Sequence, residues 1–145
     1  MSVSPTQRTI RELRNQGRRC AIVERWNSFA GAHGIRQDLF GIIDVLALDP
    51  QRGFVGVQSC GQDFAAHERK LLEERAQECI DWLSTPGGVL ELWGWRKVKL
   101  KRGGKAMRWQ PRIRELVLSD FEEQNGAARS HDREDDHGQR EHSGG

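Results

Sequence analysis

Two polar residues interrupt apolar stretches in a way that could build a metal site. Asp44 lies inside the apolar run 42–48 (IIDVLAL), and Gln58 ends a second apolar run at 54–58 (FVGVQ). Turn-forming residues at 49–53 (DPQRG) separate the runs, which predicts two strands paired as a hairpin. Such pairing brings Asp44 close to Gln58 at the far end of the second strand. A carboxylate and an amide carbonyl placed together are oxygen ligands that Mg²⁺ accepts.

A third candidate ligand, Asp38, precedes this stretch. It follows a small, polar loop expected at 27–33 and stands next to Arg36 and Gln37. Loops beside a rigid strand pair often contact the substrate, so Arg36 is a candidate nucleic-acid contact. Asp38 could equally be a capping or turn residue before Leu-Phe-Gly.

The elements Gly41-Ile42-Ile43-Asp44 and Gln58-Ser59-Cys60 resemble motifs of the PD-(D/E)XK nuclease superfamily, in its archaeal Holliday-junction-resolvase and VRR-NUC style. In that family a Gly-x-x-Asp element leads into one strand. An acidic residue or Gln, followed two places later by Lys, ends the next strand. Gln58 fits this pattern, but Cys60 stands where the Lys is expected.

The resemblance covers roughly the first two thirds of the chain and rests on short motifs. It implies an α/β fold with a restriction-endonuclease-like core: a helix, three strands, a long helix and a strand. It also implies hydrolysis of DNA phosphodiester bonds with Mg²⁺ or Mn²⁺, in branched, nicked or linear DNA. A homodimer is compatible with the resemblance, although no stretch of the sequence marks an interface.

The resemblance further implies three catalytic candidates besides Asp44 and Gln58. Glu24, in the strand expected at 19–26, stands for the extra acidic residue near the metal, or it pairs with a neighbouring arginine. Lys70 or Arg69, on the helix expected at 63–83, could replace the cation missing at Cys60. Helical periodicity places Lys70 nearly opposite the apolar face, where it would meet solvent or Glu74, and Arg69 at the edge of that face.

The remaining elements follow from local signals. Ser4 and Pro5 predict a helix that starts there and runs to about Gln16, before Gly17. The run 89–95 predicts a strand. A Gly-Gly pair between alternating runs then predicts a hairpin at 93–112.

This hairpin is strongly basic. Lys97, Lys99 and Lys101 share one face of its first arm. Edge protection against aggregation explains two or three lysines, but seven basic residues between two tryptophans favour nucleic-acid contact. The contact candidates here are Arg96, Lys97, Lys99, Lys101, Arg102, Lys105, Arg108 and Trp109.

Charge divides the chain into two parts. Residues 122–145 contain seven acidic residues and three arginines, a net charge of −4. Because the whole chain has a net charge of +2, residues 1–121 carry +6. The acidic segment is almost free of aliphatic residues and is expected to be disordered. We therefore expect one nuclease-like domain at 1–121 and a tail at 122–145.

Composition excludes several classes of protein. No apolar run is long enough to span a bilayer, and the N-terminus lacks a signal-peptide core, which predicts a cytoplasmic protein. The three cysteines form no C-x-x-C pair, so neither a disulfide framework nor a zinc knuckle is supported. Three functions remain open: a metal-dependent nuclease, a nuclease-like domain that only binds nucleic acid, and a small protein-interaction domain in which Asp44 is structural.

Overall fold

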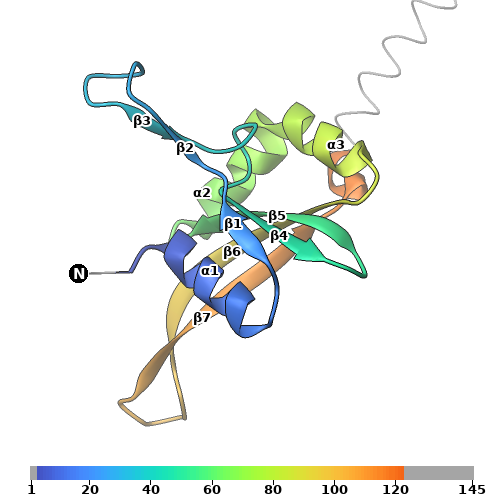
Figure 1. Ribbon diagram of the computed structural model, residues 1–145. Coiled ribbons are helices and arrows are strands. Elements are labelled where there is room, and N and C mark those ends of the chain that lie inside the picture. The colour runs from blue at the N-terminus through green and yellow to red at the C-terminus, as the bar shows by residue number, and fades with distance from the viewer. Residues whose placement is uncertain (1–2, 123–145) are drawn as a thin grey trace, which may run out of the picture.

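A five-stranded mixed sheet forms the body of the protein (Figure 1). The structure is a computed structural model, and it describes residues 3–122. The strand order is β1-β4-β5-β6-β7. Neighbouring strands are antiparallel except β5 and β6, which are parallel because a helical segment connects them. The predicted α/β class is confirmed. The strands are β1 (Cys20–Ile22), β4 (Val45–Asp49), β5 (Gly53–Cys60), β6 (Gly88–Lys99) and β7 (Met107–Leu116).

Helix α1 (Pro5–Asn15) covers one face of the sheet, as its sequence predicts. The Ser4 hydroxyl accepts a hydrogen bond from the backbone N–H of Gln7 at 3.2 Å and caps the helix. Ile10 and Leu13 are buried in a core with side chains from β4, β5 and β6, including Trp93. This face therefore has its own hydrophobic core.

The predicted hairpin at 42–58 is present, and its second strand is the centre of the sheet. Val45 pairs with Val57, and Asp49 pairs with Gly53 across the turn. Strand β4 begins one residue after Asp44, later than the apolar run suggests. From Val55 to Cys60 every residue of β5 is buried, because neighbouring strands and helices cover both its edges and faces.

The second face is covered by three helical pieces where one helix was expected at 63–83. Helix α2 (Phe64–Arg69) passes into a π-helical turn, η1 (Lys70–Glu74), and then into α3 (Ala76–Ser84). The Arg75 N–H bonds the Lys70 carbonyl at 2.8 Å, five residues back, which widens the helix there. Leu71 is fully buried, while Ala65 is exposed.

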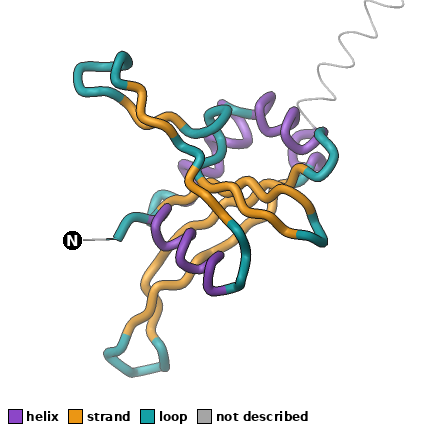
Figure 2. The backbone as a smooth tube through the Cα atoms, viewed as in Figure 1, coloured by secondary structure: helices purple, strands orange, loops and turns teal. Residues whose placement is uncertain are grey.

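The prediction of one strand at 19–26 is wrong, because the chain leaves the sheet at residues 23–24. It forms a separate two-stranded ribbon of β2 (Arg25–Asn27) and β3 (Ile35–Gln37). The expected loop joins these two strands. Figure 2 shows the ribbon projecting from the body towards the upper left of the view, whereas the tip of the β6–β7 hairpin lies at the bottom.

The predicted basic hairpin is formed by β6 and β7, with Lys99 paired to Met107 beside the tip. A 3-10 turn (Leu118–Phe121) follows and packs the fully buried Phe121 under α3. Among residues 3–122, no helix is both long and apolar enough to cross a membrane. Apart from Glu122, the expected tail lies outside the described residues.

Candidate metal centre

Asp44 is a buried carboxylate with only part of its hydrogen-bonding capacity used. Its Oδ2 accepts from the Ser59 N–H at 2.9 Å and from the Gln58 amide at 3.4 Å. Its Oδ1 is buried and has no hydrogen-bond partner among residues 3–122. Burial raises the pKa of Asp44 to about 7, helped by the charges of Asp38 and Glu24 and opposed by the Ser59 N–H. A buried oxygen of this kind calls for a cation or a proton.

Three carboxylates gather at this point. Ligand atoms of Glu24, Asp38 and Asp44 all lie within 4.8 Å of one another. The β2–β3 ribbon explains the meeting, because Arg25 pairs with Gln37 and so places Glu24 beside Asp38 at its base. The Val23 N–H then bonds the Asp44 carbonyl at 3.0 Å and holds this base against the sheet. A cluster of three like charges of this type could hold a metal ion.

Gln58 lies next to Asp44, as predicted, but its amide nitrogen faces the carboxylates. Gln58 Nε2 donates to Asp38 Oδ2 at 2.8 Å, and Gln58 Oε1 accepts from Lys70 Nζ at 3.2 Å. The side chain of Gln58 points to the helical face because alternate residues of β5 face opposite sides. A half-turn of the amide group would exchange its nitrogen and oxygen.

Lys70 belongs to the cluster, and the expectation that it meets solvent or Glu74 is wrong. Its Nζ lies 3.6 Å from Asp38 Oδ2 in addition to its contact with Gln58. The π-helical turn begins at Lys70, so the regular helical periodicity used in the prediction does not apply there. The other candidate, Arg69, is exposed on α2.

Position 60 carries no cation, and its side chain belongs to the core. Cys60 is buried with Phe64 and Leu71 under the helices. Burial, with the nearby charges of Asp63 and Asp44, raises the pKa of its thiol to about 11, so the thiol is neutral at physiological pH. The cation of the site therefore comes from the helical segment and not from the end of β5.

The two sequence alternatives for Glu24 both describe part of the structure. Glu24 belongs to the carboxylate cluster, and its Oε1 lies 3.5 Å from Arg36 Nη1. The Arg36 side chain is 70% exposed, so it could also contact a ligand beside the cluster.

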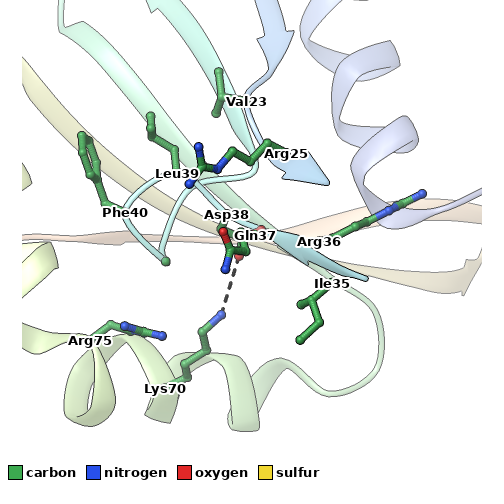
Figure 3. A pocket seen from close by; sticks show the side chains of 11 residues that line it. Val23, Arg25, Ile35, Arg36, Gln37, Asp38, Leu39, Phe40, Lys70 and Arg75 are labelled. Atoms are coloured by element: carbon green, nitrogen blue, oxygen red, sulfur yellow. Dashed lines mark ion pairs between the residues drawn. The ribbon is translucent and has the colours of Figure 1, made fainter. Parts of the chain in front are cut away.

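A cavity of about 650 Å³ opens beside the carboxylates and contains residues that the sequence did not indicate. Figure 3 shows Lys70 and Arg75 reaching in from the helical segment and Arg25 from the opposite wall. Phe40 lines the cavity as well. The only local signal of this cavity in the sequence was Phe40-Gly41, because glycine favours a turn. In the structure both residues adopt positive φ and form a tight turn.

The basic hairpin projects from the end of the sheet at which Gln58 lies. Gln58 pairs with Leu92 of the parallel strand β6, so the residues of β6 beyond Lys97 extend past the site. Trp109 lies beneath the Arg8 guanidinium at 3.8 Å and 5.4 Å from the Lys97 ammonium. Arg8 therefore joins this basic surface from α1, a contact that spacing alone could not indicate. The predicted hairpin residues Arg96, Lys99, Lys101, Arg102, Lys105 and Arg108 are all exposed.

Comparison with known proteins returned no relative: no family model, no curated protein and no solved structure matches the chain.

Proposed function

We propose that the protein is a divalent-metal-dependent endonuclease that hydrolyses phosphodiester bonds in DNA. The observation that carries the proposal is the unpartnered Asp44 Oδ1, buried among Glu24 and Asp38. Such an arrangement is costly without a positive charge, and costly arrangements of this kind cluster at functional sites.

The order of the elements supports a restriction-endonuclease-like core. Helix α1 precedes three strands, β1, β4 and β5, in which β4 is antiparallel to both of its neighbours, and the helical segment then leads to β6, parallel to β5. This is the order that the resemblance to PD-(D/E)XK nucleases implies. The β2–β3 ribbon is an insertion between the first and second of these strands.

The donor set fits Mg²⁺ or Mn²⁺. Both ions prefer carboxylate and carbonyl oxygens, and Glu24, Asp38 and Asp44 would supply three. With its amide turned, Gln58 would add a carbonyl oxygen and lose its hydrogen bond from Lys70, which Asp38 alone would then hold. A bound divalent ion would polarise the phosphodiester and lower the pKa of an attacking water. The water oxygen bonds to phosphorus as the P–O ester bond breaks, which leaves a phosphate monoester and an alcohol.

Lys70 would stabilise the negative charge that develops on the phosphate oxygens. Its ammonium group is already at the cluster, held by Gln58 and Asp38. The attraction between a fixed positive charge and the reacting group becomes stronger in the transition state, and the fixed charge needs no reorganisation to provide it. Lys70 would thus replace the lysine that the family pattern places at Cys60.

The basic hairpin would hold the DNA backbone. It projects from the end of the sheet where the carboxylates lie, and its cations are exposed. Phosphate contacts by lysine and arginine position a duplex without reading its sequence.

The test is a cleavage panel of linear, nicked, flapped and four-way DNA with Mg²⁺ or Mn²⁺. We expect cleavage by the wild type, none with a chelator, and none by Asp44→Asn, although Asp44→Asn still binds DNA. Intact cleavage by Asp44→Asn would remove the carboxylate cluster from the reaction.

A lysine exchange tests which group supplies the cation. Lys70→Met should lose cleavage, and Lys70→Met combined with Cys60→Lys should regain part of it if position 60 can still present an ammonium group. Cys60→Lys alone should lower stability, because it buries a cation in the core. Full activity in Lys70→Met would show that Lys70 has no part in catalysis.

A second candidate function is nucleic-acid binding without cleavage. The specific observation in its favour is that the Gln58 amide nitrogen, and not its oxygen, faces the carboxylates. Hydrogen bonds from this nitrogen partly neutralise the cluster without a metal. The same panel separates the two functions, since this alternative predicts DNA binding that no metal converts into cleavage.

A further inference from the structure

We propose that the cavity beside the carboxylates binds an unpaired nucleotide adjoining the cleaved phosphodiester, with Arg25 and Arg75 on its phosphate and Phe40 stacked on its base. This inference rests on the proposed function, because it names the form of substrate that the same site accepts. It gives a role to three residues for which the metal centre has no use.

Positive charge in the cavity is not balanced by its own surroundings. Within residues 3–122, Arg25 makes no ion pair, and the only ion pair of Arg75 is with Glu78 at 4.0 Å. The cations Lys70 and Arg36, by contrast, already face Asp38 and Glu24. Two guanidinium groups on opposite walls of a cavity, one without an ion pair and the other with a single long one, suit a phosphate, which arginine binds through several N–H groups.

The turn at Phe40 and Gly41 fits Arg75 closely. A Cβ atom at Gly41 would lie 3.0 Å from the Arg75 guanidinium carbon, so the guanidinium packs on the glycine backbone. Gly41 has a φ of 75°, which glycine adopts without strain. The turn therefore positions Arg75 at the cavity wall.

Phe40 is placed at some cost with its ring largely exposed, although one side of the ring faces Trp82, with 6.4 Å between the ring centroids. Its side chain is 61% exposed, and its φ of 57° is a conformation that bulky residues rarely adopt. Asn or Gly would form this turn with less strain. Strain retained beside a candidate site, at an exposed aromatic ring, points to a use for that ring.

The position of the ring determines the form of nucleotide. Phe40 lines the same cavity as Arg25 and Arg75, so a strand bound there brings a base to the ring. Aromatic side chains bind single strands by stacking on bases of any sequence. A base inside a duplex is stacked and paired already, so the bound nucleotide must be unpaired. Single strands, flaps and opened junctions provide such nucleotides.

The experiment measures binding of a fluorescein-labelled single strand and of the matching blunt duplex, by anisotropy, in a chelator. The chelator removes cleavage and metal from the measurement. The variants are Phe40→Ala, Phe40→Leu, Arg25→Gln and Arg75→Gln. Phe40→Leu keeps an apolar side chain in the turn and so separates stacking from folding. The controls are Phe29→Ala, at a 98% exposed ring, and Arg19→Gln, at the other end of the sheet.

We expect the wild type to bind the single strand more tightly than the duplex. Phe40→Ala and Phe40→Leu should each weaken single-strand binding about 10-fold and leave duplex binding unchanged. Each arginine variant should reduce the salt dependence of single-strand binding by about one phosphate contact. The controls should match the wild type.

Equal wild-type affinity for both forms, or equal losses on both forms in the Phe40 variants, would overturn the inference. The experiments can contradict this inference without contradicting the proposed function, and the reverse. If no DNA is cleaved but the single-strand preference depends on Phe40, the nuclease proposal fails and the cavity assignment stands. If cleavage depends on Asp44 but binding ignores Phe40, the reverse holds.

Discussion

Asp44 shows how one residue can couple stability to function. Its pKa is about 7 in the folded protein against 3.8 for an ordinary aspartate, mainly because burial disfavours the charged form. Between these pH values the folded chain keeps a proton that the unfolded chain releases. The free energy of unfolding therefore falls as pH rises from about 4 to about 7, in the absence of metal.

We expect Asp44→Asn to stabilise the metal-free protein above pH 7, because it removes a buried charge next to Asp38 and Glu24. The gain should be on the order of 2 kcal/mol and should disappear near pH 4. Thermal denaturation in a chelator at several pH values measures it. A lower melting temperature of Asp44→Asn at pH 8 would instead assign Asp44 a structural role.

Metal should stabilise only the protein that has Asp44. Millimolar Mg²⁺ or Mn²⁺ should raise the melting temperature of the wild type, and more so as pH rises through 7, because the ligand must be ionised. The matched comparison is Asp44→Asn, in which the shift should be absent. Equal shifts in both proteins would place any bound metal elsewhere.

Phe40 is a second residue that lowers the stability of the folded protein, through its positive φ. Phe40→Asn should have a free energy of unfolding about 1 kcal/mol above that of Phe40→Ala, because asparagine adopts positive φ with less strain and both substitutions remove the contact of the ring with Trp82. Denaturant titration measures this gain. Phe40→Ala is the control, since it truncates the ring without relieving the backbone. If both substitutions change stability equally, the backbone at Phe40 is not strained.

At the scale of single elements, the β6–β7 hairpin gives the sharpest prediction. Replacing Lys97, Lys99 and Lys101 together with alanine should weaken binding to any DNA sequence and reduce its salt dependence by up to about three phosphate contacts. Binding measured over a range of salt concentrations gives this slope. Arg14→Ala with Arg19→Ala removes exposed charges at the other end of the sheet and should change the slope less. An unchanged slope in the lysine variant would exclude the hairpin from the DNA surface.

The helical segment illustrates a different property of elements. A regular helix through residue 70 would follow the apolar periodicity of its sequence and turn Lys70 away from the sheet. The π-helical turn alters that periodicity and brings Lys70 to Gln58. Such turns occur often at functional sites, where they redirect a side chain.

In the whole molecule, a rigid sheet supports two projecting hairpins. Figure 1 shows the β2–β3 ribbon projecting from the sheet. Strand β5 and the neighbouring part of β6 have core on both faces, whereas the ribbon and its loop expose Trp26 and Phe29. The carboxylate cluster lies at the base of the ribbon, because Glu24 and Asp38 flank it. Metal bound at the cluster would join the ribbon to the body.

Amide hydrogen exchange should show this division. Residues 55–58 and 90–93 should exchange slowest and the β2–β3 ribbon fastest, because the ribbon has little buried surface. Mg²⁺ should slow exchange in the ribbon and at Asp38 while leaving the sheet unchanged. Equal protection of ribbon and sheet without metal would contradict this description.

The sequence alone determined the elements whose signals are local. Ser4 and Pro5 marked the start of α1, the turn at 49–53 set the β4–β5 hairpin, and Gly103-Gly104 marked the second hairpin. Each signal depends on the conformational preferences of adjacent residues. The proximity of Asp44 and Gln58 was also predictable, because pairing across a hairpin follows from its turn.

The rest of the site comes together through contacts between elements that are distant in the sequence. Glu24 lies beside Asp38 because β2 pairs with β3, and these strands are too short to be predicted from the sequence. Lys70 reaches Asp38 because a π-helical turn changes the helical periodicity at that residue. Arg25 and Arg75, fifty positions apart, line one cavity because the ribbon and the helical segment lie on opposite sides of it. Contacts between such distant positions depend on the packing of whole elements, for which local spacing carries no information.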